Sequence, residues 1–154
     1  KKYLVNKIYS VLGKNLTNYK FLCWGMAFKP ETDDLREAPS IEIITELIES
    51  GATVYIHDPI TTPKLNKYFP KEWFESQKII ITNNMYDYID QAEALILLTE
   101  WKFFRNPDLN KLKDNLYGKY IFDGRNQLDP EAIESLGIRY YGIGRGRVFK
   151  MEKD

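Results

Sequence analysis

The sequence predicts one doubly wound α/β domain, in which a mainly parallel sheet of five to six strands has helices on both faces. Apolar runs of strand length alternate about five times with segments of helical spacing, which is the pattern of parallel strands joined through helices. No hairpin signal joins successive strands, so crossover helices must connect them. The run ALILLT at 94–99 is apolar throughout, as expected of a strand that is buried on both faces.

Helices are predicted where apolar side chains recur three and four residues apart between start and stop residues. The first helix, at 1–12, ends at Gly13. The second begins at Pro39, which lacks the N–H that a first turn leaves unpaired, and is closed by Gly51. The other predicted helices are a short one at 61–69 and three more at 85–91, 109–116 and 130–137.

Strands are predicted where compact runs of β-branched and aromatic residues are bounded by turn residues. The first strand, at 19–24, ends at Gly25, and the second, at 53–57, ends at Asp58. A loop of about a dozen residues follows the first strand, which is long enough to suspect a function. The remaining predicted strands are 78–82, 94–99, 119–123 and 138–143.

Composition and charge bound the class of protein. The chain has 154 residues, 22 basic and 22 acidic side chains, and 44% hydrophobic residues. At about 100–200 residues per domain, this length gives one domain with a sizeable core. Balanced charge argues against a nucleic-acid partner, and no run approaches the roughly 18 apolar residues of a membrane span. We therefore expect a cytoplasmic protein that binds neither nucleic acid nor membrane.

Cys23 and His57 are the only cysteine and the only histidine. An internal disulfide and a Cys/His zinc cluster are therefore excluded, and we expect no metal site. A serine or cysteine nucleophile would have to use His57 as its base. Because no nucleophile, base and orienting group converge in the predicted loops, we expect no catalytic residue in this chain.

The turns after the strands hold the candidate binding residues, because open α/β sheets bind ligands at the carboxyl ends of their strands. A dinucleotide-binding unit has G-x-G-x-x-G after its first strand. Here that turn reads GMAFKPETDDLREAPS, with Gly25 alone and Ala27 in place of the second glycine. The sequence therefore predicts a Rossmann-like domain without the usual dinucleotide cradle. Asp58, at the place of a ribose-binding acid, fits better as a turn and capping residue.

Cationic side chains follow two of the strands at this edge. Lys29 and Arg36 lie in the first loop, and Arg125 lies in the DGRN turn. A guanidinium binds phosphate through two parallel hydrogen bonds, but Lys29 could also be solvated and Arg36 could pair with neighbouring carboxylates. Arg125 is either a phosphate ligand or the ion-pair partner of Asp123. Trp101 either stacks on a base or sugar or covers the core. Together the three cations suggest an anionic ligand.

Three segments carry a family resemblance: WGMAFKPETDDLREAPSIEIITELIESGATVYIHDP, ALILLTEWKFFR and IFDGRN. In this order they resemble the C-terminal domain of the nucleotide-sugar dehydrogenases, the UDP-glucose/GDP-mannose dehydrogenase family. The resemblance runs from about residue 1 to residue 144. It implies a parent enzyme whose N-terminal domain binds NAD, whose central region carries a catalytic cysteine, and whose C-terminal domain holds the UDP part of the substrate.

The resemblance also implies a reaction and roles for single residues. UDP-glucose, oxidised twice to UDP-glucuronate, is the nearest substrate match, with UDP-N-acetyl-mannosamine and GDP-mannose as alternatives. Phe28 and Lys29 are expected to contact the nucleotide-sugar, Arg125 to bind UDP, and Arg36 to reach NAD across the domain interface. The family's glycine-rich cradle and cysteine segment are missing, and Cys23 is not in that context. We therefore expect a fragment that is inactive alone, with NAD held mainly by an absent domain.

The expected organisation is the end of an interdomain helix at 1–16, a UDP-binding domain at 17–144 and a polar tail at 145–154. The start at Lys1 rather than Met fits an excised piece. Its expected partners are UDP-glucose or UDP and the N-terminal and central domains of the parent. We expect the parent to be a homodimer and the fragment a monomer. In a different class, a receiver-like signalling module would need an acceptor aspartate after the third strand, where Thr82 and Asn83 stand.

Overall fold

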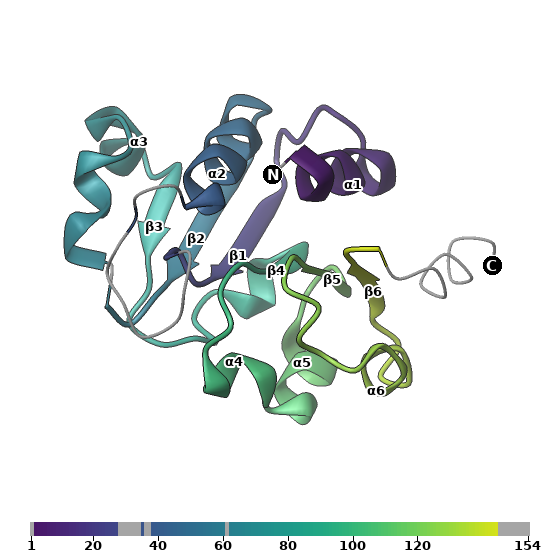
Figure 1. The fold of residues 1–154 in the computed structure, drawn as a ribbon. Coiled ribbons are helices and arrows are strands. Elements are labelled where there is room, and N and C mark those ends of the chain that lie inside the picture. The colour runs from purple at the N-terminus through teal and green to yellow at the C-terminus, as the bar shows by residue number, and fades with distance from the viewer. Residues whose placement is uncertain (1, 28–34, 36–37, 61, 145–154) are drawn as a thin grey trace.

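The structure, a computed structural model, describes residues 2–27, 35, 38–60 and 62–144. Its centre is a six-stranded sheet in the order β3-β2-β1-β4-β5-β6 (Figure 1). All neighbouring strands pair in parallel. The strands are β1 Lys20–Trp24, β2 Thr53–His57, β3 Ile79–Ile81, β4 Ala94–Leu97, β5 Tyr120–Asp123 and β6 Arg139–Gly142. Because β1 lies between β2 and β4, the chain reverses its direction of travel across the sheet there, and this reversal defines the edge where such folds bind ligands.

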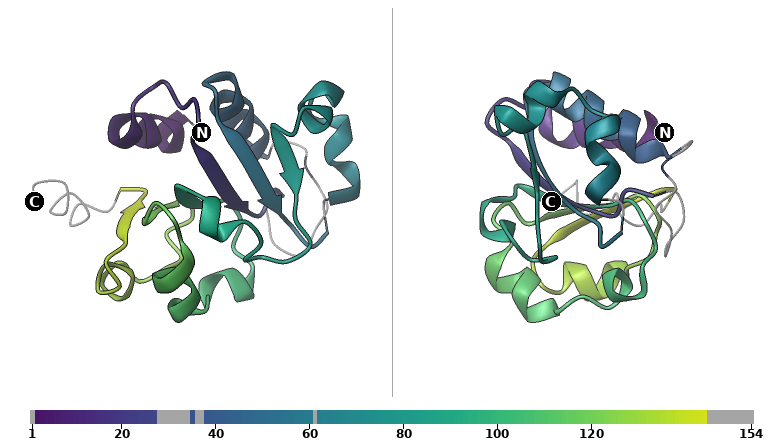
Figure 2. Two further views of the ribbon diagram at one scale, coloured as in Figure 1. Left: turned by 180° about the vertical axis from the view of Figure 1, so that it is seen from behind. Right: turned by 90° about the vertical axis from the view of Figure 1, so that its left-hand side faces the viewer.

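Helices cover both faces of the sheet, as the rotated views show (Figure 2). One face carries α1 Lys2–Leu12, α2 Pro39–Glu49 and α3 Lys71–Glu75. The other carries α4 Lys102–Arg105, α5 Leu109–Asn115 and α6 Pro130–Glu134. Two 3-10 helices, η1 Thr62–Lys67 and η2 Ile89–Gln91, complete the described elements. The predicted doubly wound fold with a preceding helix is confirmed.

The core lies on both sides of the two central strands. All four residues of β4 and residues 21–24 of β1 are buried. On the side of α4, the Trp24 ring stacks on Phe104 at 5.1 Å and meets the edge of Tyr86 at 5.7 Å. Burying one such large apolar side chain contributes about 1.5–3 kcal/mol. Within the apolar run at 94–99, the strand β4 spans Ala94–Leu97, and all of its residues are buried, as expected of a strand covered on both faces.

Local sequence signals set where several helices start. Pro39 occupies the first turn of α2, where its missing N–H leaves nothing unpaired. The Asp108 carboxylate accepts hydrogen bonds from the first N–H groups of α5, and the Asp129 carboxylate does so for α6. Within the described residues, no helix is long and apolar enough to cross a membrane.

The predicted helix at 85–91 is wrong. Only Ile89–Gln91 is helical there, as a 3-10 turn. The Trp24 indole donates a 2.7 Å hydrogen bond to the Met85 carbonyl, which an α-helix would need for itself. Tyr88 has a left-handed backbone with φ 66°, which also interrupts a helix. Two short helices, α3 and α4, were not predicted. Within the range 61–69, where a short helix is predicted, the structure has the 3-10 helix η1 at Thr62–Lys67.

Candidate functional site

The first turn at the carboxyl edge is packed against the end of β4. Gly25 has φ +92°, and a Cβ atom there would lie 2.4 Å from Thr99 Cβ. The Thr99 hydroxyl in turn donates a 2.7 Å hydrogen bond to the Ala27 carbonyl. Gly25 is therefore needed for a close backbone approach between neighbouring strand ends rather than to make room for a ligand.

The main chain of this turn is also committed to protein partners. The Met26 N–H donates to Oδ2 of Asp58 at 2.8 Å, and the Ser40 hydroxyl donates to the Met26 carbonyl. The other Asp58 oxygen accepts from the Ile60 N–H at 2.9 Å, so Asp58 acts as the turn residue that the sequence indicated. A dinucleotide cradle needs main-chain N–H groups that face the pyrophosphate. The described residues of this turn do not fit such a cradle for NAD.

A buried carboxylate organises the DGRN turn after β5. Asp123 Oδ1 accepts from the Arg125 N–H at 3.1 Å, and Oδ2 accepts from the Gln127 and Leu128 N–H groups at 2.8 and 2.9 Å. The Tyr140 hydroxyl donates to Oδ2 at 2.7 Å. Burial raises the pKa of Asp123 above its usual range, and these four hydrogen bonds oppose the rise only in part. The side chain therefore holds the turn that presents Arg125.

Asn126 ties the same turn to the end of β6. Its amide group donates to the Ile143 carbonyl, and its oxygen accepts from the Ile143 N–H, both at 2.7 Å. Asn126 has φ 51°, a left-handed backbone that asparagine tolerates better than most residues. The asparagine of DGRN thus fixes the backbone next to Arg125.

The ion pair of Arg125 differs from the one that the sequence suggested. Its Nε atom lies 3.1 Å from Oε1 of Glu100, which follows β4. The side chains are 28% and 42% exposed, respectively. Asp123, the partner considered from sequence spacing, binds the Arg125 main chain instead, because its carboxylate is turned into the core. The feature of the sequence that points to Glu100 is its position just after β4, the strand next to β5.

Arg125 lines a cavity of about 180 Å³ at the carboxyl edge. Tyr3 and Leu4 of α1 form one wall, Ser40 and Ile43 of α2 form another, and the turn after β5 completes it. The lining is mostly apolar and includes the cationic residue Arg125. Apolar walls with a few placed polar groups are typical of small-molecule sites, so an anionic organic ligand suits this cavity.

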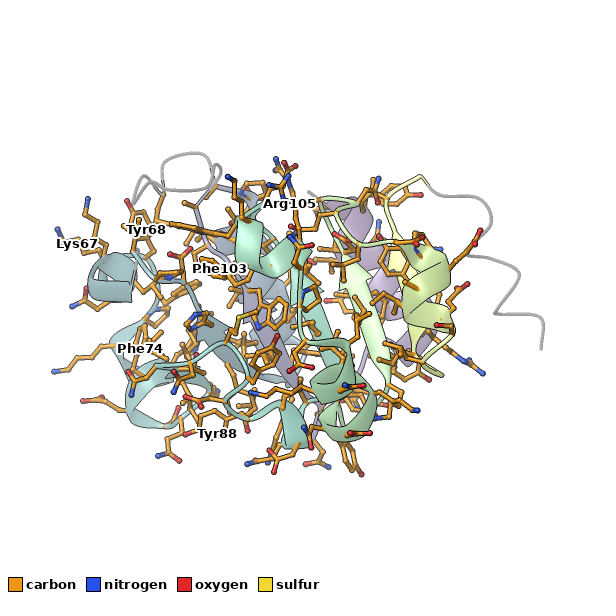
Figure 3. The ribbon with its side chains drawn as sticks, turned by 90° about the horizontal axis from the view of Figure 1, so that it is seen from below. Lys67, Tyr68, Phe74, Tyr88, Phe103 and Arg105 are labelled. Atoms are coloured by element: carbon orange, nitrogen blue, oxygen red, sulfur yellow. The ribbon has the colours of Figure 1, made fainter. Side chains whose placement is uncertain are left out.

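The structure describes only some of the other candidate residues. Phe28, Lys29 and Arg36 lie outside the described residues. Trp101 is only 8% exposed, with its ring 5.4 Å from that of Phe103, which agrees with a cover over the core. Phe103 itself is exposed on the α4 face (Figure 3).

His57 ends β2 beside Thr82, with 3.2 Å between Nδ1 and the hydroxyl oxygen. Burial lowers the pKa of the imidazole, against smaller opposing effects of Thr82, Asp58 and Asp87. Among the side-chain contacts that the structure describes for His57, the partner is the Thr82 hydroxyl, and neither a serine nor a cysteine is within a hydrogen bond of the ring. Nor do the described residues contain a group of three or more His, Cys, Asp or Glu that could hold a metal ion.

Comparison of this chain with known proteins shows the family to which it belongs. Residues 22–130 match the UDP-binding domain of the UDP-glucose/GDP-mannose dehydrogenase family. The chain is 40% identical over 124 residues to a UDP-glucose 6-dehydrogenase of Pseudomonas aeruginosa, covering 80% of this chain and 27% of that protein. It is 36% identical over 149 residues to an uncharacterized protein of Methanocaldococcus jannaschii, covering 94% of this chain and 16% of that protein.

A solved structure shows the same architecture. The UDP-glucose dehydrogenase of Pyrobaculum islandicum superimposes with a TM-score of 0.70 at 29% identity, over 92% of this chain and 28% of that chain. The chain therefore spans less than a third of the length of each of these three proteins. It belongs to the UDP-glucose/GDP-mannose dehydrogenase family and corresponds to the UDP-binding domain of that family.

Proposed function

We propose that this chain is the C-terminal domain of an NAD-dependent UDP-glucose 6-dehydrogenase and binds the UDP part of UDP-glucose. The observation that carries this proposal is the placement of Arg125 at a mostly apolar cavity on the carboxyl edge. A guanidinium matches the geometry of phosphate oxygens. The apolar walls on α1 and α2 suit the nucleoside that such a phosphate carries.

The turn of Arg125 is held by several hydrogen bonds. Asp123 and Asn126 fix its main chain through hydrogen bonds of 2.7–3.1 Å. Binding then costs less ordering of the protein, which favours affinity. Phe28 and Lys29 are proposed to contact the same nucleotide-sugar from the first loop.

The remaining chemistry is assigned to the rest of a longer parent enzyme. We propose that residues 17–144 form the UDP-binding domain, that 1–16 end an interdomain helix, and that 145–154 form a tail. An N-terminal domain would bind NAD, with Arg36 reaching across the interface, and a central region would carry the cysteine for the two oxidations to UDP-glucuronate. The parent would be a cytoplasmic homodimer, and this chain alone a catalytically inactive monomer.

Other sugars remain alternatives within the family. Enzymes acting on UDP-N-acetyl-mannosamine or GDP-mannose carry the same type of domain, and the hexose would lie mostly against other domains. The activity of the complete enzyme on a panel of nucleotide sugars tests this choice. The receiver-like alternative has lost its support, because the chain belongs to the dehydrogenase family.

A titration with UDP, followed by two-dimensional amide NMR, tests the proposal. We expect weak, saturable binding, because closure by the other domains is absent. The largest shifts are expected at Ser40, Gly124 and Arg125, which line the cavity. Uridine, which lacks the diphosphate, should bind far more weakly. Shifts confined to the amino ends of the strands, or equal binding of uridine and UDP, would contradict the proposal.

A further inference from the structure

We propose that α1 is a movable wall of the ligand cavity, so that docking of α1 and binding of the nucleotide stabilise each other. This inference rests on the proposed function and deepens it. Tyr3 and Leu4 of α1 line the cavity. A Cβ atom added at Gly124 would lie 3.1 Å from Cδ2 of Leu4, so α1 packs directly on the turn after β5.

The contacts that hold α1 differ in kind from those that hold the strands. Main-chain hydrogen bonds join each strand to its neighbours, whereas none of those between described residues joins α1 to another element. Instead, α1 docks through side chains. Leu4, Val5 and Ile8 are almost completely buried, and the Lys7 ammonium lies 5.9 Å from the centre of the Tyr141 ring. Because an isolated helix of 11 residues is marginal in water, α1 depends on this packing.

The two ends of α1 are held differently. At its C-terminal end, a 2.6 Å hydrogen bond joins the hydroxyl groups of Tyr9 and Ser50, and the Leu16 N–H just beyond donates to the Ser50 carbonyl at 2.8 Å. At the end that lines the cavity, the Lys2 ammonium lies 3.8 Å from the Glu46 carboxylate, and the Lys2 side chain is exposed. Exposed ion pairs typically contribute only about 0–1 kcal/mol. The cavity end is therefore the more weakly held end.

A pivot lies between α1 and Leu16, which is fully buried. Residues 13–15 are exposed, and Gly13 has φ +90° with nothing within 4 Å of an added Cβ atom. Hinges are short segments of this kind, whose backbone torsions can change without disturbing the packing around them. Turning about residues 13–15 costs the hydrogen bond between Tyr9 and Ser50 and leaves the sheet intact. It carries one wall away from the cavity.

The position of α1 is coupled to the ligand by thermodynamic linkage. A nucleotide that contacts Tyr3 and Leu4 only when α1 is docked favours the docked state, and docking favours the nucleotide by the same factor. At a hundred times its dissociation constant, such a ligand makes opening of α1 about a hundredfold rarer. In the longer parent enzyme proposed above, α1 would carry the occupancy of the cavity to the chain before it.

Thiol labelling, located by mass spectrometry of peptides, measures the opening of α1. Val5→Cys places a thiol under α1, at a residue that is 2% exposed and does not line the cavity. Cys23 in β1 reports opening of the sheet in the same chain. Without UDP, we expect the introduced thiol to be labelled faster than Cys23. UDP at a hundred times its dissociation constant should slow that labelling about a hundredfold.

Val54→Cys is the matched control, because it makes the same replacement at a fully buried valine within β2. Its thiol should be labelled no faster than Cys23. Amide hydrogen exchange of α1 and β4 in the unchanged chain gives the same comparison without a substitution.

Three results would overturn the movable wall: labelling of Val5→Cys only at the rate of Cys23, equally fast labelling of Val54→Cys, or no protection of Val5→Cys by bound UDP. In each case saturable binding of UDP, followed by NMR, would leave the proposed function standing. Absence of saturable binding would contradict the proposed function and this inference with it, so the two failures are distinguishable.

Discussion

The Tyr140 hydroxyl donates a 2.7 Å hydrogen bond to Oδ2 of Asp123, and both side chains are fully buried. Tyr140 belongs to β6, the edge strand, whereas Asp123 ends β5 and holds the turn that carries Arg125. The outermost strand thus supports the candidate binding residue through one buried carboxylate. The sheet therefore stabilises the turn of Arg125 through the hydrogen bond between Tyr140 and Asp123.

Replacing Tyr140 with phenylalanine tests that support. The change removes one donor to a buried carboxylate, and we expect a loss of about 1–3 kcal/mol in the free energy of unfolding. The pKa of Asp123 should rise further, because the hydrogen bond from Tyr140 lowers it. Urea unfolding and carboxyl NMR titration measure the two effects. Tyr117→Phe, at a side chain that is 69% exposed, is the control, and an equal loss in both variants would contradict the account.

Gly25→Ala tests the close approach between β1 and β4. The new Cβ atom would lie 2.4 Å from Thr99 Cβ, at a residue with φ +92°. The cost of the positive φ and the steric overlap with Thr99 therefore add. We expect a loss of about 3 kcal/mol or failure to fold. Gly137→Ala is the matched control, since it has φ +81° with nothing within 4 Å.

Gly137→Ala should lower the free energy of unfolding by only about 1 kcal/mol, the cost of placing a residue with a Cβ atom at positive φ. Thermal or urea unfolding of both variants gives the comparison. Similar losses at Gly25 and Gly137 would show that the contact with Thr99 is unimportant.

Stability should depend on pH through His57, the only histidine. Burial lowers the pKa of the folded imidazole, so the unfolded chain binds the proton more tightly. The free energy of unfolding should therefore fall as pH drops through the unfolded pKa of about 6.5 to the lower folded value. Above that window, the contribution of the neutral imidazole is fully present.

The imidazole resonance of the folded chain reports the folded pKa directly by NMR. In His57→Asn, the free energy of unfolding should no longer fall with pH in this window. The effect of carboxylate titration at lower pH should be the same in both chains. A folded midpoint above about 6.5 would contradict the prediction.

Cys23 should be unreactive in the folded chain. It lies in β1 with no exposed surface, and burial raises the pKa of its thiol far above the usual range, so almost no thiolate forms. A thiol reagent should label it at the rate of global unfolding in buffer and rapidly in denaturant. Rapid labelling without denaturant would show that β1 opens locally.

The sequence was informative where local signals and burial agree. All six strands of the sheet were predicted, because each is an apolar run that is bounded by turn residues. The segment at 85–91 was misassigned because contacts from distant residues decide it: Trp24 takes the Met85 carbonyl, and the Tyr88 ring stacks on Tyr55 at 4.4 Å. Figure 3 shows Tyr88 on the surface opposite α1 and α2.

The site was predicted only in part for a similar reason. The DGRN turn stood out because Arg125 follows a buried strand, which spacing along the chain reveals. Its partner did not, because Glu100 is 25 residues away in sequence and meets Arg125 only through the parallel register of β4 and β5. Asp123, two residues away, was the nearer candidate, but its carboxylate is buried and occupied by main-chain N–H groups.

The most direct test of the account is the effect of Arg125→Ala on the UDP dissociation constant of the chain. A guanidinium that grips the diphosphate should be worth about tenfold or more in affinity. Arg139→Ala is the control, because Arg139 is exposed and begins β6 at the opposite end of the strands. The account predicts a loss of at least tenfold for Arg125→Ala and no change for Arg139→Ala, whereas equal affinities for the two variants would contradict it.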